Sequence, residues 1–223
     1  MIKATYIDHM GSDLSIVNAA RVSFGKKSDW KPIDVEDRVD DFNCLQDKDA
    51  KLIKYLAKHK HMSPFGHAFI SVHVKAPIFV ARQLVKHKFL RWNEISRRYV
   101  DSEPEFYSPV WRESVKDKKQ GSGGDLVGEL QDKNTYQTSL VEGKSVDLYK
   151  EMLRTGVCPE QARMVLPQST MTEWYWSGSL DAFADMCKLR LKEDTQYETR
   201  LVAQQVDEII KPLFPVAWKE LLK

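Results

Sequence analysis

The hydrophobic pattern of the chain changes abruptly at Pro77, and this change constrains the fold more than any other local feature. Apolar and polar residues alternate over residues 69–75, which predicts a strand with one buried face. Pro77 suits the first position of a helix, because its φ is already helical and its missing N–H would have no partner there. The residues behind it predict a helix that runs to about Lys88. A strand is therefore followed directly by a helix.

The same order occurs again in the last third of the chain. Alternation around two tryptophans predicts a strand over residues 170–177, and Ser179 is a candidate N-cap for a helix that carries Arg190. Strands and helices do not alternate in regular βαβ units. We therefore expect an α+β fold, with a mixed or antiparallel sheet flanked by helices.

The remaining segments predict a first strand and several more helices. Residues 1–8 alternate as a strand, and Ser12 or Asp13 can cap a helix that reaches about Phe24. The other helical patterns are a stripe over residues 52–57, a long stretch to about Arg154 that Gly156 can stop, and an apolar face at Val202, Val206, Ile209, Ile210 and Leu213 behind a capping box at residues 195–198.

Length predicts a single domain over residues 1–223, or one domain with a small appendage. Hydrophobic residues make up 42% of the chain and include six Trp, eight Tyr and nine Phe, which is enough to build a core. The polar segment 25–47 predicts a loop. The glycines, serines and lysines of residues 112–125 predict a mobile surface loop.

The polar character of the chain excludes an integral membrane protein. Its mean hydropathy is −0.47, and no run approaches the roughly 20 apolar residues that span a bilayer. The first residues lack an apolar stretch long enough for a signal peptide. Cys44, Cys158 and Cys187 are an odd number at scattered spacing, which fits a reducing compartment better than a disulfide framework. We expect a cytoplasmic protein, in the host cytoplasm if the chain is viral.

Common nucleotide-binding and hydrolase motifs are absent from the sequence. It has no Walker loop, no Gly-x-Gly-x-x-Gly between a strand and a helix, and no Gly-x-Ser-x-Gly elbow. The histidines at 59, 61, 67 and 73 lack a helical i, i+4 pair and have no nearby cysteine, so we expect no metal site. Any nucleotide must be held by side chains and irregular backbone.

Residues 82–99 hold the densest group of polar side chains with varied chemistry. On the helix predicted from Pro77, Gln83, Lys86 and His87 fall at i, i+3 and i+4 and therefore share a face. Cations at the end of this helix suit phosphate groups, and the amide of Gln83 suits the edge of a base or a sugar hydroxyl.

A second polar array follows the predicted helix. Glu94, Ser96 and Arg98 project to one side if the chain is extended there. A solvated basic helix end and a nucleic-acid-binding surface are the alternatives for this region. The interleaved Trp92 and Tyr99 are unusual for plain surface, and a net charge of only +2 argues against a broad nucleic-acid interface.

Five short blocks occur in a characteristic order along the chain. They are His61-x-Ser-Pro-Phe-x-His67, the run from His73 to Gln83, Lys86-His87-Lys88 followed by seven residues and Ser96, Ala162-Arg163-x-Val-Leu-Pro167, and Leu189-Arg190. Together they resemble the flavin-dependent thymidylate synthases, whose signature is usually Arg-His-Arg, seven residues and Ser. The resemblance covers nearly the whole chain apart from residues 25–47 and 112–125.

The resemblance implies a homotetramer whose active sites are shared between subunits and bind FAD and dUMP. It also implies that 5,10-methylenetetrahydrofolate donates the carbon and that NADPH reduces the flavin. The implied nucleotide contacts are Gln83, Lys86, Glu94, Ser96, Arg97, Arg98, Arg163 and Arg190. The implied flavin contacts are His61, Ser63, Lys86, His87, Lys88, Glu94, Ser179 and Asp185.

The resemblance gives Arg190 the catalytic position against the uracil ring. A guanidinium at the O2/N3 edge stabilises negative charge that develops on the ring, and arginine stays cationic throughout. The flavin carries hydride in this family, so no cysteine nucleophile is needed. The unrelated class of thymidylate synthase does use one, but we interpret Cys158 as packing at a helix entry before Pro159.

The sequence departs from the family pattern in two ways. Lys-His-Lys replaces Arg-His-Arg, which keeps the charge but loses the planar fork of arginine. Asp185 stands where a neutral amide is expected near the flavin, and Asp181 where a cation is common. A nucleotide-binding module that has lost catalysis is therefore a competing hypothesis.

Overall fold

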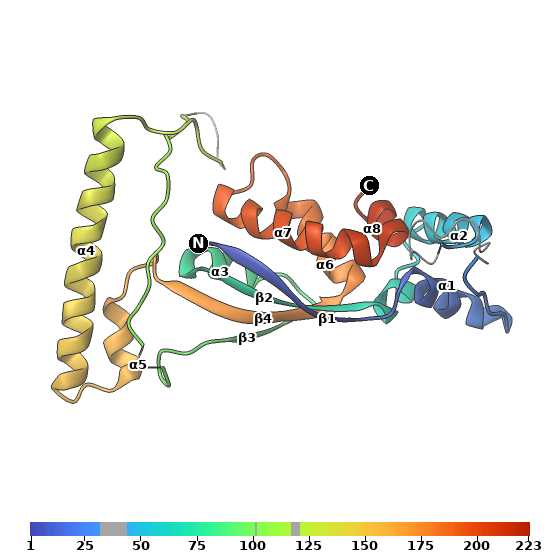
Figure 1. Cartoon of the computed structure of the whole chain (residues 1–223), viewed down its shortest axis with the longest axis horizontal. Helices are drawn as coiled ribbons and strands as arrows, with labels where there is room; N and C mark the ends of the chain where they lie inside the picture. The colour runs from blue at the N-terminus through green and yellow to red at the C-terminus, as the bar shows by residue number, and fades with distance from the viewer. Residues whose placement is uncertain (32–43, 101, 117–120) are drawn as a thin grey trace, which may run out of the picture.

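A four-stranded antiparallel sheet forms the centre of the protein. The computed structural model describes residues 1–31, 44–100, 102–116 and 121–223. The sheet has the strand order β1-β2-β4-β3, and helices cover one of its faces (Figure 1). Its strands are β1 (Lys3–Met10), β2 (Phe69–Pro77), β3 (Leu90–Glu94) and β4 (Met171–Ser179). The predicted α+β class with an antiparallel sheet is confirmed.

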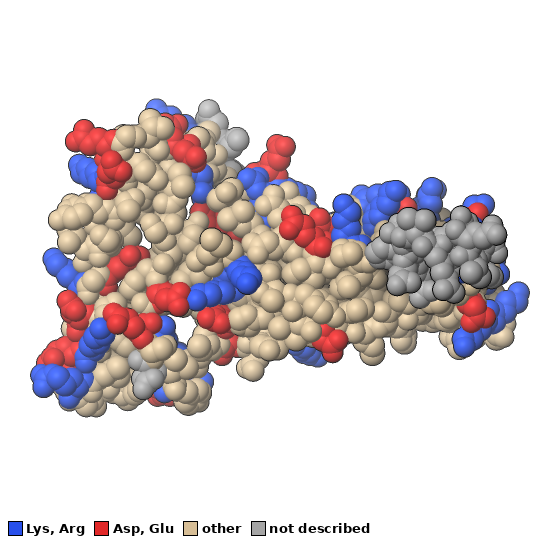
Figure 2. Space-filling view, viewed as in Figure 1, with Lys and Arg blue, Asp and Glu red and all other residues tan. Residues whose placement is uncertain are grey.

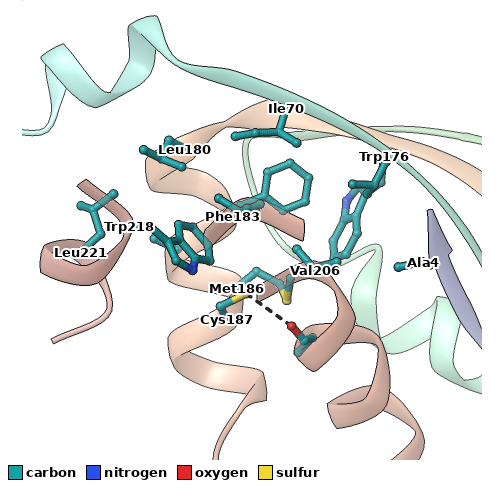
Figure 3. Packing of buried hydrophobic residues seen from close by; sticks show 14 of the residues in the cluster. Ala4, Ile70, Trp176, Leu180, Phe183, Met186, Cys187, Val206, Trp218 and Leu221 are labelled. Carbon is teal, nitrogen blue, oxygen red and sulfur yellow. Dashed lines mark hydrogen bonds between the residues drawn. The ribbon is translucent and has the colours of Figure 1, made fainter. Parts of the chain in front are cut away.

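Three C-terminal helices form the layer above the sheet. They are α6 (Leu180–Arg190), α7 (Tyr197–Leu213) and α8 (Pro215–Leu221). Trp176 of β4, Phe183 and Met186 of α6 and Val206 of α7 are buried together between these layers (Figure 3). The thiol of Cys187 donates to the carbonyl of Ala203, which links α6 to α7. This layer fixes the position of Arg190 at the end of α6.

The long strands β2 and β4 were predictable because buried and more exposed side chains alternate along them. In β2, Val72 and Val74 face the helices and are fully buried, whereas His73 faces the other side. His73 pairs with Glu173 at 3.2 Å on that polar face. The expectation that His73 is a strand residue with a local partner is confirmed.

The edge strand β3 was not predicted. It pairs with β4 from Leu90↔Gly178 to Glu94↔Trp174. Trp92 stacks on Trp174 with their ring centroids 4.3 Å apart. A Cβ at position 178 would collide with Cδ2 of Leu90 and lie 3.1 Å from the carbonyl oxygen of Phe89, so this close approach favours glycine.

Two helix boundaries differ from the sequence prediction. The helix α3 (Ile78–Leu84) starts directly after Pro77 but ends at Leu84, before the predicted Lys88. The predicted capping box at residues 195–198 is wrong, because the N-cap of α7 is Gln196 and it has no side-chain capping bond. The hydroxyl of Thr195 instead donates to the carbonyl of Leu189. Ser179 is the N-cap of α6 by position, but its side chain makes no capping hydrogen bond.

The N-terminal helices lie at one end of the sheet (Figure 1). Ser12 caps α1 in a reciprocal capping box with Ser15. Asp13 accepts hydrogen bonds from the backbone N–H groups of Val216 and Ala217, which ties α1 to α8, and burial raises its pKa. The elements here are α1 (Asp13–Arg21), η1 (Val22–Phe24), α2 (Asp47–Lys58) and η3 (Ser63–His67).

A long helix stands apart at the opposite end of the molecule (Figure 1). The helix is α4 (Glu129–Arg154), and it is followed by the short helices α5 (Pro159–Ala162) and η4 (Arg163–Val165). Only Val146 and Tyr149 of α4 are buried. Within the described residues, no helix is both long and apolar enough to cross a membrane.

The segment predicted as a mobile loop at 112–125 starts and ends as a backbone-paired hairpin. Arg112 and Asp125 form an isolated antiparallel bridge. The N–H of Glu113 donates to the carbonyl of Gly124 over 2.9 Å. Residues 117–120 lie outside the described residues, and the mobility of the segment stays a prediction.

Candidate active site

Arg190 and His87 meet between the end of α6 and the turn that follows α3. The Nε–H of Arg190 donates to Nε2 of His87 over 3.0 Å. This geometry assigns the proton of the neutral imidazole to Nδ1. A group 103 positions away in sequence therefore fixes the orientation of the guanidinium.

Burial keeps the His87 imidazole neutral. Burial, and then the positive charge of Arg190, lower the pKa of His87 to about 4. Burial also lowers the pKa of Arg190, but a guanidinium remains cationic at neutral pH. The pair therefore consists of one fixed cation and one neutral acceptor. It presents a single positive charge in a partly water-excluded place.

Gln83 joins this pair from the last turn of α3. Its Nε2 lies 3.5 Å from Oε1 of Gln196, and its own Oε1 is buried and has no hydrogen-bond partner among the described residues. A buried unpaired amide oxygen is costly, so it is a candidate contact for a donor on a ligand. A cavity of about 390 Å³ lies here, and its lining is Gln83, Arg112, Gly121, Ser122, Arg190, Thr195, Gln196 and Tyr197.

The predicted shared face of Gln83, Lys86 and His87 is wrong in its geometry. The helix ends at Leu84, so Lys86 and His87 belong to the following turn. Phe89 has a φ of 66°, which reverses the chain into β3. The fold brings Gln83 and His87 together through Arg190 and Gln196 instead. The side chains of Lys86 and Lys88 are exposed.

Glu94 is held at the end of β3 by two donors. Its carboxylate accepts from the hydroxyl of Thr172 at 2.6 Å and from the indole N–H of Trp92 at 3.0 Å. The predicted one-sided array of Glu94, Ser96 and Arg98 requires an extended chain. Residues 97–99 form a turn, so the extended chain does not reach Arg98.

The turn after β3 holds the other predicted nucleotide contacts. Ser96 Oγ accepts from Nε of Arg98 at 3.0 Å, and the Arg98 guanidinium lies 4.8 Å from the ring centre of Tyr99. Arg97 donates to the carbonyl of Ser102. The turn therefore presents two arginines and a hydroxyl, a set that suits a phosphate.

Arg163 lies at the α4 end of the molecule. Its Nε donates to the carbonyl of Glu160 over 3.3 Å, and its side chain is exposed. Within the described part of the chain, no hydrogen bond or ion pair joins Arg163 to Gln83, His87 or Arg190.

His61 and Ser63 line a separate cavity of about 790 Å³ at the α1–α2 end. The His61 ring is nearly parallel to that of Tyr55, at 14° and 6.0 Å between centroids. Arg21 and Ser23 also line this cavity. Flat rings, hydroxyls and cations in one hollow are the groups that hold an aromatic, phosphate-bearing ligand.

Asp181 and Asp185 line a third cavity, of about 640 Å³, with several lysines. Oδ1 of Asp181 is buried, and no residue that the structure describes forms a hydrogen bond with it. The lysines of this cavity are Lys54, Lys58, Lys60, Lys188 and Lys223. Figure 2 shows Lys and Arg side chains gathered where α8 meets α2. The carboxylates therefore lie among cations, which reduces their repulsion of an electron-rich ligand.

Comparison with known proteins decides the family. A family model described as "Thymidylate synthase complementing protein" matches residues 5–216. A flavin-dependent thymidylate synthase of Thermus thermophilus is 40% identical over 213 residues, which are 95% of this chain and 72% of the relative. The chain belongs to the flavin-dependent thymidylate synthase family. Its relative in Kosmotoga olearia is 37% identical and is covered to 88%.

Solved structures share the whole fold of this flavin-dependent thymidylate synthase family member. The UMP/dUMP methylase PolB from Streptomyces cacaoi, bound with 5-Br dUMP, superposes with a TM-score of 0.82 at 28% identity. The match covers 99% of this chain and 94% of that one. The same methylase bound with 5-Br UMP gives a TM-score of 0.83.

Several residues that line the cavity beside Gln83 and Arg190, called the central cavity below, were missed by sequence reasoning. Gln196 and Tyr197 were interpreted as part of a capping box, which hid their position beside Arg190. Arg112 and Ser122 lie in the segment that the family resemblance does not cover. Only the folded chain places them beside Gln83.

Cys158 occupies the N-cap of α5 and is exposed, directly before Pro159. The helix-entry part of the interpretation is confirmed, but the packing part is wrong, because the thiol is exposed. Among the described residues, no group of three or more His, Cys, Asp or Glu side chains could hold a metal ion.

Proposed function

We propose that this chain is an FAD-dependent thymidylate synthase that converts dUMP to dTMP. In this proposal 5,10-methylenetetrahydrofolate donates the carbon and NADPH is the reductant. The single observation that carries it is the Arg190–His87 pair beside Gln83, a fixed cation and an unfilled acceptor in one cavity. The named activities of the relatives and the bromo-nucleotides in the solved structures support it.

Arg190 is the proposed catalytic residue, at the O2/N3 edge of the uracil ring. Its guanidinium stabilises negative charge that develops on the ring when C6 accepts a nucleophile or C5 acts as one. His87 prevents rotation of this guanidinium and, because it is neutral, does not compete for the negative charge. Preorganisation of this kind lowers the barrier, since no dipole has to reorient during the reaction.

The proposed nucleotide contacts divide by chemistry. Gln83 meets the nucleoside through its unfilled oxygen, and Glu94 offers a carboxylate that Thr172 and Trp92 hold in place. Cationic groups suit the phosphate. The cations and the hydroxyl assigned to the phosphate and sugar are Lys86, Ser96, Arg97, Arg98 and Arg163.

The residues assigned to FAD fit such a group in their chemistry. The cavity beside His61 and Ser63 combines flat rings with cations, and Asp185 lies in a cavity with lysines. The unpartnered Oδ1 of Asp181 leaves an acceptor for a ligand donor there. The flavin supplies a hydride carrier when bound. The residues proposed to hold it are His61, Ser63, Lys86, His87, Lys88, Glu94, Ser179 and Asp185.

Neither Cys187 nor Cys158 is placed as a nucleophile for this site in the described part of the chain. Burial raises the pKa of the Cys187 thiol, which disfavours the reactive thiolate. Cys158 is at the entry of α5, and no hydrogen bond or ion pair among the described residues joins it to Arg190 or His87. Reduced thiols at both positions suit the cytoplasmic location that we propose.

We propose a homotetramer with shared active sites. The assigned residues divide into separate groups within one chain, at Arg190, at the turn after β3, at Arg163 and beside His61. Copies of the chain can complete each site by bringing these groups together. Leu130, Val141 and Leu148 are exposed on one face of α4, and such an apolar stripe is typical of an interface.

One purified sample distinguishes this function from the competing hypothesis of a nucleotide-binding module that has lost catalysis. We expect a yellow protein whose flavin absorbance bleaches with NADPH in the presence of dUMP, and which forms dTMP when methylenetetrahydrofolate is added. Bleaching without dTMP, or no bound flavin, would reject the proposal. Cys158→Ser should retain most of the turnover, whereas abolished turnover would favour a cysteine-nucleophile mechanism.

A further inference from the structure

Arg112 enters the central cavity from a segment to which nothing else assigns a role. It lies at the base of the hairpin at 112–125, paired with Asp125 through the backbone. Its side chain lines the same cavity as Gln83 and Arg190. The family resemblance does not cover this segment, so the resemblance gives no role for Arg112.

Three neighbours hold the Arg112 side chain in one orientation. Its Nη2 donates to Oε1 of Glu198 at 2.6 Å, and its Nε donates to Oγ of Ser122 at 2.8 Å. The guanidinium carbon lies 4.7 Å from the ring centre of Tyr197. The Arg112 side chain is 18% exposed and that of Glu198 only 4%. Such a guanidinium loses little further freedom when it binds a ligand.

The hydrogen bonds of Arg112 leave part of its donor capacity unused. A guanidinium has five N–H groups, and the contacts above use the Nε–H and one N–H of Nη2. Among the described residues, Nη1 has no hydrogen-bond partner. Arg112, a side chain with unused donors, and Gln83, whose Oε1 is an unfilled acceptor, therefore line the same cavity, and Arg112 also lines a neighbouring cavity of about 350 Å³.

This combination selects the chemistry of the ligand group. A phosphate offers almost only acceptors at neutral pH, whereas a pyrimidine edge or a sugar hydroxyl offers a donor beside an acceptor. Glu198 also balances the charge of Arg112, so the pair attracts a dianion weakly. A neutral nucleoside oxygen is the better partner.

We propose that Arg112 is a further substrate-binding residue, which donates through Nη1 to a neutral oxygen of the nucleoside part of the nucleotide. The inference rests on the proposed function, since it places the nucleotide in the cavity of Arg190. Glu198 and Tyr197 are then positioning residues that act through Arg112.

The test compares three variants of the flavin-loaded protein by calorimetric titration with dUMP. Arg112→Lys keeps the charge opposite Glu198 but loses the planar fork. The double variant R112M/E198Q loses the donor without leaving a buried charge unpaired. Arg200→Lys is the matched control, because Arg200 lies 5.8 Å from the same Tyr197 ring and donates to the Glu193 carbonyl but does not line the cavity.

We expect dUMP to bind roughly 10- to 100-fold more weakly to both Arg112 variants, the loss typical of one charge-assisted hydrogen bond. Arg200→Lys should stay within about twofold of wild type. The ratio of variant to wild-type Kd should remain constant across pH 5.5–7.5, where a phosphate of pKa about 6 loses its second proton. A ratio that grows with pH would mean a phosphate contact and would overturn the proposal.

Thermal unfolding distinguishes a role of Arg112 in binding dUMP from a role in stabilising the fold. Unchanged dUMP affinity with a lowered Tm, or unfolding of both Arg112 variants but not of Arg200→Lys, would make Arg112 a structural residue. Failure of the wild type itself to bind dUMP would instead reject the proposed function.

Discussion

Arg190 donates its Nε–H to Nε2 of His87 over 3.0 Å, and this contact joins the end of α6 to the turn that follows α3. It uses only one of the five donors of the guanidinium. Among the described residues, the remaining donors of Arg190 have no hydrogen-bond partner, and Arg190 lines the same cavity as Gln83. His87 therefore holds the Arg190 guanidinium in one orientation while the other N–H groups of Arg190 can still bind a ligand.

Replacement of Arg190 should slow turnover far more than it weakens folding. We expect Arg190→Ala to lower kcat by roughly 10²–10³, the range found when one preorganised charge-stabilising donor is removed. Arg190→Lys keeps a charge but loses the Nε donor to His87, so its loss should be intermediate. Steady-state assays of dTMP formation measure both. A loss below tenfold for Arg190→Ala would show that its role is misassigned.

His87 should make the stability of the protein depend on pH between about 4 and 6.5. Its pKa is about 4 in the folded protein and 6.5 in an unfolded chain, so the unfolded chain binds more protons in this window. Stability is therefore lost as pH falls from 6.5 towards 4, and the contribution is constant above 6.5.

His87→Gln removes this titration but retains an acceptor for Arg190. We expect the variant to gain about 1 kcal/mol, roughly 2–4 °C in Tm, relative to wild type between pH 7.5 and 4.5, a value reduced because His87 is only half-buried. Scanning calorimetry at four pH values measures the difference. Parallel Tm curves for the two proteins would contradict the shift.

The sequence predicted the long strands because their side chains alternate between a buried and an exposed face, as Val72, Val74, Trp174 and Trp176 show. It missed β3, because this edge strand has five residues and only Leu90 and Trp92 pack against the core. The end of α3 was also missed. No local signal marks Val85, and the reversal at Phe89 depends on the approach of Gly178.

The candidate site was predictable only in part. Family resemblance supplied Arg190, His87 and Gln83, and the fold brings these three together. Arg112 could not be found in this way, because its relation to Glu198 spans 86 positions and arises only in the folded chain. Polar residues far apart in sequence carry no periodic signal that would pair them.

The exposed lysines of the signature triplet should tolerate exchange for arginine. Lys86 and Lys88 make no ion pair within the described residues, so a longer planar head group has room at both positions. We expect Lys86→Arg and Lys88→Arg to retain at least the wild-type ratio of flavin to protein absorbance after gel filtration. Complete loss of flavin in either variant would show that the pocket is built around lysine.

The apolar stripe of α4 should hold copies of the chain together. Leu130, Val141 and Leu148 recur at intervals close to three and two helical turns, so they share one face, and each is about half exposed or more. We expect Val141→Asp and Leu148→Asp to sediment as species smaller than a tetramer of 25.8 kDa chains, and to lose dTMP synthesis with their helical circular dichroism intact. Burying an unpaired carboxylate in an interface costs several kcal/mol, which is enough to dissociate it. Ser139→Asp adds the same charge at an exposed position two and a half turns from Leu130, on the opposite side of α4, and should remain tetrameric and active. If Val141→Asp and Leu148→Asp sediment like wild type, α4 is not the interface between copies. Contacts through α4 could then not bring the separated groups of the site together.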